Sequence, residues 1–157
     1  MIKFLSVFGT VILVVLALTL RSPFGRESHK FDFAKAEQST YTTQDPLVES
    51  MKRGAEVYTE YCIQCHLGQG EGVPGAFPPL AKSDWLTTDK REAAIRVVKY
   101  GQSGEIQVNG VTYNSAMAEL GLYDDEVADV MNYILNNWGN SSEAIVTEEE
   151  VKKIEKE

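Results

Sequence analysis

Residues 61–66 read Tyr-Cys-Ile-Gln-Cys-His, and this short stretch decides how the chain folds. It holds both cysteines of the 157-residue chain and one of its two histidines. A disulfide between cysteines three positions apart would close a loop too short to stabilise a fold. In a helical turn, however, side chains at positions i and i+3 lie on the same side. The spacing therefore indicates a group that both thiols bind together, with the His66 imidazole directly behind them.

Two other kinds of CxxC site fit this chain poorly. A structural zinc site needs four ligands, but there is no third cysteine and the other histidine is the distant His29. A redox-active pair of the thioredoxin type needs a βαβ setting, whereas this pair follows a helical pattern. The C-x-x-C-H pattern is a signature of c-type haem attachment. Cys62 and Cys65 are therefore predicted to bond one covalent haem c, and His66 is predicted to bind its iron.

The second axial ligand of such an iron has four candidates in the sequence. Met51 and Met131 lie on apolar faces of predicted helices, where a methionine is usually a packing residue. Met117 lies instead in an irregular segment about 50 positions after His66, so the chain can pass over the ring and return. Met117 is the predicted ligand. The alternatives are His29, the other methionines and an open or water-bound iron.

Sequence patterns around the motif predict a mainly helical domain with one small hairpin. Asp45-Pro46 is expected to begin a helix with Val48, Met51, Ala55 and Tyr58 on one face. A second helix is expected to open with a capping box at Asp89–Glu92 and to end at Gly101, and a hairpin is expected to turn at Asn109-Gly110. The last expected elements are a helix over Asp124–Trp138 ended by Gly139 and a short charged helix begun by Thr147. The glycine- and proline-rich stretch Gly68–Leu80 is an expected loop. These elements leave a thin core unless the haem fills its middle.

The charge of the chain limits its partners. The formal net charge is −8, and residues 45–157 carry 20 acidic against 10 basic side chains. Nucleic-acid binding needs a basic face, so this charge argues against it. It favours a redox protein partner with a basic docking face.

The start of the chain carries a candidate membrane segment. Phe4–Leu20 is an uncharged, mainly apolar run of 17 residues, which as a helix reaches about 25 Å. No convincing cleavage site follows it, so an N-terminal transmembrane anchor is expected, with a cleaved signal sequence or a buried soluble helix as alternatives. One basic side chain precedes the run and four follow it before residue 44. The positive-inside rule alone would therefore place the rest of the chain in the cytoplasm.

Motifs beyond the CxxCH resemble those of the small class I c-type cytochromes. The resemblance covers about residues 46–139 and rests on Gly54–Tyr58, Phe77-Pro78-Pro79-Leu80, Trp85, the Tyr113…Met117 segment and Asp125–Val130. It is strongest to the cytochrome domains and subunits that accompany bacterial periplasmic oxidoreductases and nitrite reductases. Two positions depart from the pattern. Ala118 stands where many relatives have proline after the ligand methionine, and Tyr123-Asp124 replaces the usual serine cap, a role that Asp124 can fill.

The resemblance implies a cytochrome c-like helical fold around one covalent haem. It also implies that the Pro78 carbonyl accepts a hydrogen bond from His66 and that Gly54 meets Tyr133. The remaining pocket residues expected from the sequence are Leu80, Ile95, Val98 and Leu120 in the wall, and Trp85 and Tyr113 either at the haem propionates or as plain core packing. The expected domains are a membrane anchor or signal at 1–20, a flexible tether at 21–44, a cytochrome c domain at 45–140 and a charged C-terminal tail at 141–157.

The resemblance implies electron transport rather than catalysis, because His66 and Met117 would fill both axial positions. The chain is then expected to carry one electron between membrane or periplasmic partners of a respiratory chain, without a small-molecule substrate. Haem attachment of this type takes place on the exported side of the membrane. The haem domain is therefore expected to face the bacterial periplasm from the inner membrane, or to be soluble there after signal cleavage. A peroxidase-like enzyme and a haem-based sensor, each with a displaceable sixth ligand, are the alternatives.

Overall fold

Helix α2 (Pro46–Val57) begins the part of the chain that the computed structural model describes, residues 45–142 and 144–156. The Asp45 side chain caps this helix by accepting a hydrogen bond from the Leu47 N–H at 2.9 Å. Proline at the first helical position needs no hydrogen bond there. The predicted start of the helix is confirmed.

The buried face of α2 differs from the expected one. Val48 is 56% exposed, whereas Ser50, Gly54 and Tyr58 form the buried row at four-residue spacing. The α5 backbone crosses so close to Gly54 that a larger side chain would not fit. Tyr58 is buried as expected, but an apolar pattern alone does not identify Ser50 and Gly54.

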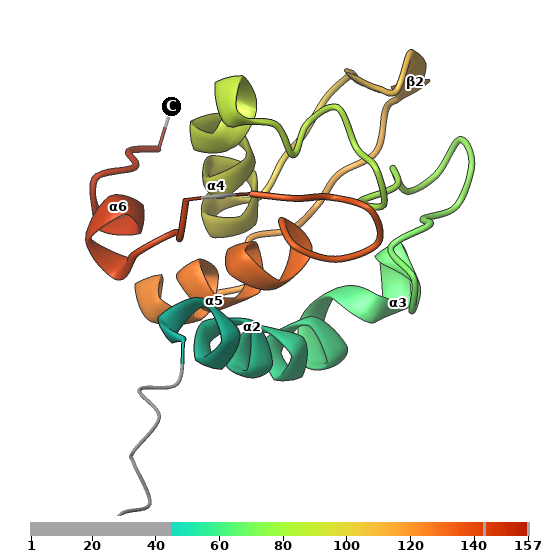
Figure 1. Ribbon diagram of the computed structural model, residues 1–157. Coiled ribbons are helices and arrows are strands. Elements are labelled where there is room, and N and C mark those ends of the chain that lie inside the picture. Colours follow the sequence, from blue (N-terminus) through green and yellow to red (C-terminus); the bar gives the residue numbers. More distant parts are fainter. Residues whose placement is uncertain (1–44, 143, 157) are drawn as a thin grey trace, which may run out of the picture. The chain divides into compact units, whose positions relative to one another are not determined.

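The helix continues past Val57 into the CxxCH motif. A π-helical turn, η2 (Tyr58–Cys62), leads into α3 (Ile63–His66), which ends where Leu67 takes a φ of 62°. The Tyr58 hydroxyl donates to the Leu67 carbonyl oxygen at 2.6 Å. This bond ties the end of the motif back to the helix that carries it. Figure 1 shows α3 as the continuation of α2.

Helix α4 (Arg91–Tyr100) begins differently from the prediction. A single 3₁₀ turn, η3 (Thr88–Lys90), precedes it, and no side chain caps its N-terminus, so the expected capping box is absent. The predicted end is confirmed, because Gly101 closes the helix with a φ of 80°.

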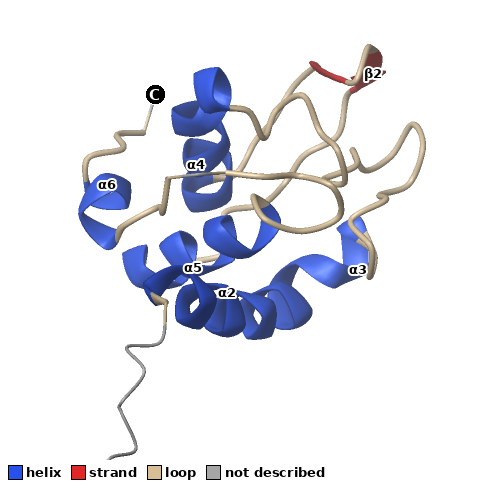
Figure 2. Ribbon diagram, viewed as in Figure 1, coloured by secondary structure: helices blue, strands red, loops and turns tan. Residues whose placement is uncertain are grey.

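The predicted hairpin consists of β1 (Ile106–Val108) and β2 (Val111–Tyr113), drawn as red strands in Figure 2. Val108 pairs with Val111, and the turn residues Asn109 and Gly110 have φ values of 51° and 76°. Two positive φ values are typical of the type I′ turn that Asn-Gly favours.

Helix α5 (Asp124–Ile134) lies at the centre of the domain and packs against α2, α4 and α6. It is four residues shorter than predicted, because the chain turns away after Leu135 and Trp138 takes a left-handed φ of 52°. Its cap is also different. The Glu126 carboxylate accepts from the Tyr123 N–H at 2.8 Å, and Asp124 instead pairs with Lys99 at 2.9 Å.

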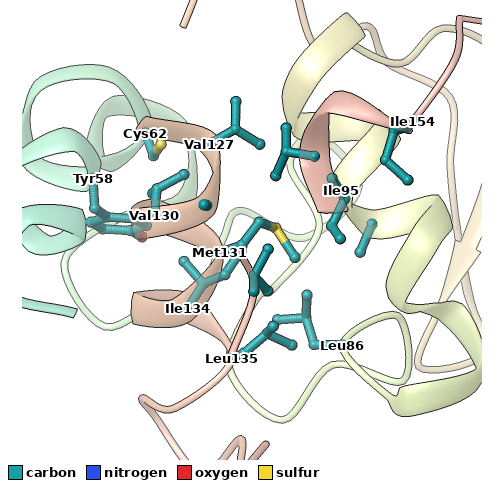
Figure 3. Close-up of a cluster of buried hydrophobic side chains, with 14 residues drawn as sticks. Tyr58, Cys62, Leu86, Ile95, Val127, Val130, Met131, Ile134, Leu135 and Ile154 are labelled. Atoms are coloured by element: carbon teal, nitrogen blue, oxygen red, sulfur yellow. The ribbon is translucent and has the colours of Figure 1, made fainter. Parts of the chain in front are cut away.

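The last residues of the chain belong to the same core. Helix α6 (Glu148–Lys152) begins at Thr147, whose hydroxyl accepts from the Glu150 N–H. Val146, Val151 and Ile154 are each at most 7% exposed and join the apolar cluster around α5 (Figure 3). The expected tail at 141–157 is charged on its outer side, but these three apolar side chains are buried.

A buried polar network ties this C-terminal segment to the helix crossing. Asp129 accepts from the Ser50 hydroxyl and from Arg53, both at 2.6 Å. Asn132, which is fully buried, donates to Ser50 at 2.8 Å and exchanges two hydrogen bonds with the backbone of Val146. Elements from both ends of the described chain therefore depend on one set of hydrogen bonds.

The expected membrane segment and tether lie outside the described residues, as does His29. Among the residues that the structure describes, no helix is long and apolar enough to cross a bilayer.

Candidate functional site

A cavity of about 330 Å³ lies beside α3, α4, α5 and the hairpin. Its walls are mostly apolar. Residues Ala94, Val97 and Val98 of α4 contribute to them, as do Ile106 and Val108 of β1. A flat hydrophobic group would find apolar surroundings in this space. It would in turn add the apolar contacts that the small core lacks.

The residues that the sequence predicts for the haem site converge on this cavity, with the exceptions of Tyr113 and Ile95. Those that line it are Cys62, Cys65, His66, Pro78, Leu80, Trp85 and Met117. Tyr113 is buried in β2 but is not part of the wall. These residues come from η2 and α3, from the segment between α3 and η3, and from the loop before α5, so the fold rather than local sequence brings them together.

No disulfide joins the two cysteines, and Cys62 is buried whereas Cys65 is half-buried. Burial, and then the neighbouring Cys65, raise the pKa of Cys62 to about 11. A redox-active or metal-binding cysteine needs a lowered pKa, because the thiolate is the reactive form. The surroundings of Cys62 therefore do not activate it as a redox-active or metal-binding thiolate.

His66 is held in one orientation by the loop that follows it. Its Nδ1 lies 3.0 Å from the Pro78 carbonyl oxygen, which can only accept a hydrogen bond. The ring nitrogen Nδ1 is therefore the donor, and Nε2 remains as a free acceptor. Burial lowers the pKa of His66, against the opposing effect of the Pro78 contact, so the imidazole is neutral at pH 7. A neutral imidazole with one nitrogen already engaged is the usual form of a metal-binding histidine.

Met117 reaches the same cavity from the loop before α5. Of the three methionines that the structure describes, it alone lines the cavity, while Met131 is buried in the core and Met51 lies on α2. The backbone of Met117 exchanges two hydrogen bonds of 2.8 Å with Gln102, two positions after the end of α4. The donor set is then one imidazole nitrogen and one thioether sulfur beside two thiols, which fits a covalently bound haem.

The two aromatic residues predicted for the propionates have other neighbours. The Trp85 indole N–H donates to the Gln107 carbonyl oxygen at 2.6 Å, and Lys90 lies 5.4 Å from its ring centre. This bond ties the hairpin to the turn that carries Trp85. Tyr113 is 5% exposed, in the opposite strand of the hairpin. A role for either residue at the cofactor remains a prediction.

Several wall residues were not predicted from the sequence. Ile106 and Val108 point to one side of β1, a two-residue periodicity that could have identified them. Ser115 also lines the cavity, but a serine in an irregular loop gives no such signal. Val98 and Leu120 line the cavity as expected, whereas Ile95 is fully buried in the core and is not part of the cavity wall.

Comparisons with known proteins agree with this geometry. A family model described as cytochrome c matches residues 51–138. Cytochrome c-552 of Thermus thermophilus is 41% identical over an alignment of 109 residues, which covers 64% of this chain and 82% of that protein. The cytochrome c subunit of a quinone alcohol dehydrogenase from Gluconobacter oxydans is 36% identical over 64% of this chain, but over only 21% of its own length. The cytochrome c subunit of a gluconate 2-dehydrogenase from Pantoea cypripedii is 30% identical over 78% of this chain and 30% of its own.

Proposed function

Because this chain belongs to the cytochrome c family, whose members bind haem c covalently, we propose that it carries single electrons between redox proteins. Cys62 and Cys65 hold the haem through thioether bonds, and His66 and Met117 are its axial ligands. The observation that carries this proposal is the convergence of these four side chains on one apolar cavity.

Each part of the chain has a distinct task in this function. The haem supplies a one-electron couple when bound. The Pro78 carbonyl keeps the His66 imidazole in the tautomer whose Nε2 is free, and makes that nitrogen a better donor. The apolar walls exclude water, and a methionine ligand favours the reduced state, so both features raise the reduction potential.

Ligand replacement tests the proposal directly. In the full-length haem-loaded protein, Met117→Leu should abolish the red charge-transfer band of a methionine-ligated ferric haem and allow the ferrous form to bind carbon monoxide. Met51→Leu is the matched control, because Met51 lies on α2 away from the cavity. A Met117→Leu protein with an unchanged spectrum would show that Met117 is not the ligand. Ready carbon monoxide binding by the unmodified protein would instead favour a peroxidase-like enzyme or a sensor.

The names of the relatives suggest partners. Several are cytochrome c subunits of dehydrogenases, and the present chain is proposed to be a non-catalytic electron acceptor or carrier for such an enzyme. The excess of acidic side chains in residues 45–157 favours a partner with a basic docking face. Electron-transfer rates should then fall as ionic strength rises. Rates that do not depend on salt would indicate an apolar contact instead.

The proposed location is the periplasmic face of a bacterial inner membrane, with Phe4–Leu20 as the anchor. The support is the length and apolarity of that run. Fractionation of cells that produce the full chain, with protease digestion of spheroplasts, tests both the anchor and its orientation. Recovery of the haem domain in the soluble periplasmic fraction would mean that the segment is cleaved.

A further inference from the structure

One side chain joins the loop that carries Met117 to the loop whose Pro78 carbonyl oxygen contacts His66. The Ser115 hydroxyl donates to the Ala76 carbonyl oxygen at 2.7 Å, although the two residues are 39 positions apart. Ser115 lies two positions before Met117. Ala76 lies two positions before Pro78, whose carbonyl oxygen contacts His66. This hydrogen bond therefore connects the segment on the histidine side with the segment on the methionine side.

The acceptor end of the bond is rigid. Val73 and Phe77 exchange two backbone hydrogen bonds of 2.8 Å, and the Ala76 N–H donates to the Val73 carbonyl oxygen at 3.0 Å. Gly72 packs so closely on this turn that an added Cβ would lie 2.4 Å from the Phe77 carbonyl oxygen. The Ala76 carbonyl is thus held in a tight turn that cannot follow a moving partner.

The donor end has few other attachments. Within the described part of the chain, residues 114–118 are joined to the rest by three hydrogen bonds. Two link the backbone of Met117 to Gln102, and the third is the Ser115 bond. The segment has no regular structure, and both Ala116 and Ala118 are exposed. It contains no proline that would restrict its backbone.

We propose that Ser115 is a positioning residue that holds Met117 in place and so restricts exchange of this ligand for an external one. The inference rests on the proposed function, because it requires Met117 to be an axial ligand. Displacement of Met117 from the iron needs movement of residues 114–118, and the Ser115 bond opposes that movement. Loss of one such hydrogen bond should raise the population of the displaced loop by about two- to tenfold.

The test compares serine variants of the full-length haem-loaded protein. Ser115→Ala should increase the rate of carbon monoxide binding to the ferrous form by about two- to tenfold. It should also weaken the red charge-transfer band of the ferric form and lower the reduction potential. Ser115→Thr keeps the hydroxyl donor and should restore all three values. Ser103→Ala, which alters an exposed serine just after Gln102, is the control and should behave as the unmodified protein.

Three results would overturn the inference, and they are distinguishable. If Met117→Leu binds carbon monoxide rapidly but Ser115→Ala matches the unmodified protein, Met117 is the ligand and Ser115 does not position it. If Met117→Leu changes neither the band nor the binding rate, the ligand assignment fails, and the role of Ser115 fails with it. Equal effects of Ser115→Ala and Ser115→Thr would also contradict it, because a lost hydroxyl could then not be the cause.

Discussion

Gly54 of α2 and Asp129 of α5 lie in backbone contact. A Cβ added at Gly54 would come within 2.0 Å of the Asp129 carbonyl oxygen and 2.9 Å of the Tyr133 Cβ. Gly54→Ala therefore forces the two helices apart, and we expect it to lower the free energy of unfolding by at least 1–3 kcal/mol, the usual range for an overpacked core. Guanidinium unfolding of the haem-loaded protein measures this loss.

Gly68 is the matched control for this substitution. It has no positive φ, and an added Cβ would meet nothing within 4 Å. Gly68→Ala should leave stability unchanged or raise it slightly, because alanine restricts the unfolded chain. Equal losses for the two variants would mean that the contact with Asp129 is not what requires glycine at position 54.

Gly101 lies against the backbone of Met117, the proposed methionine ligand. It has a φ of 80°, and an added Cβ would lie 2.5 Å from the Met117 carbonyl oxygen. Gly101→Ala should displace Met117 and weaken the red charge-transfer band. Gly104→Ala has a similar backbone cost, since its φ is 89°, but open space around it. If both variants lose the band equally, backbone strain rather than the contact with Met117 is responsible.

The features that were predicted most accurately from the sequence are those that depend on neighbouring residues alone. Asp45 with Pro46, and Asn109 with Gly110, specify a helix start and a hairpin turn through their own conformational limits, and the structure has both. The CxxCH motif likewise carries its chemistry within six residues. Such features need no knowledge of distant contacts.

Predictions that depended on tertiary contacts were less accurate. Helix α5 ends at Ile134 because the chain turns to bring Trp138 against Tyr58, at 4.9 Å between ring centres, and nothing in the local pattern requires that turn. The role of Ser115 depends on a carbonyl 39 positions away. Both are consequences of packing that one-dimensional periodicity does not contain.

The C-terminal segment should contribute measurably to stability. Ile154 is 7% exposed, and the neighbouring Tyr100 hydroxyl donates to its carbonyl oxygen at 2.9 Å. Ile154→Ala should lower the free energy of unfolding by about 2–5 kcal/mol. Ile145 is 38% exposed, so Ile145→Ala, which removes the same atoms, should lower the free energy of unfolding clearly less. Similar unfolding midpoints for the two variants would show that residues 144–156 do not depend on their buried side chains.

An acid-sensitive contact holds the same segment. The Arg91 guanidinium donates to both carboxylate oxygens of Glu150, at 2.7 and 2.9 Å, and lowers the pKa of Glu150 below its usual 4.5. A carboxylate whose pKa is lower in the folded state than in the unfolded state stabilises the fold when the pH is above 4.5. This stabilisation is lost as the pH falls from 4.5 through the pKa of the folded state. The melting temperature should therefore fall more steeply below pH 4.5 in the unmodified protein than in Glu150→Gln. Glu149→Gln, on an exposed residue, controls for the removed charge.

Removal of the haem should unfold the domain. A cavity of about 330 Å³ left open would cost about 8 kcal/mol, at about 24 cal/mol for each Å³. That cost is comparable to the whole net stability of an ordinary domain, about 5–15 kcal/mol. The chain produced without haem attachment should therefore show a weak helical circular-dichroism signal and no cooperative melting, in contrast to the haem-loaded protein.

Replacing the cysteines separates the effect of filling the cavity from the effect of the covalent bonds. In Cys62→Ala/Cys65→Ala, haem added to the chain can still bind through His66 and Met117 and fill the space, but without thioether links. This variant should regain helical structure and cooperative melting with haem, at a lower melting temperature than the covalent form and with loss of haem under denaturing conditions. Cooperative melting of the haem-free chain would contradict the argument, because the residues around α5 would then form a sufficient core by themselves.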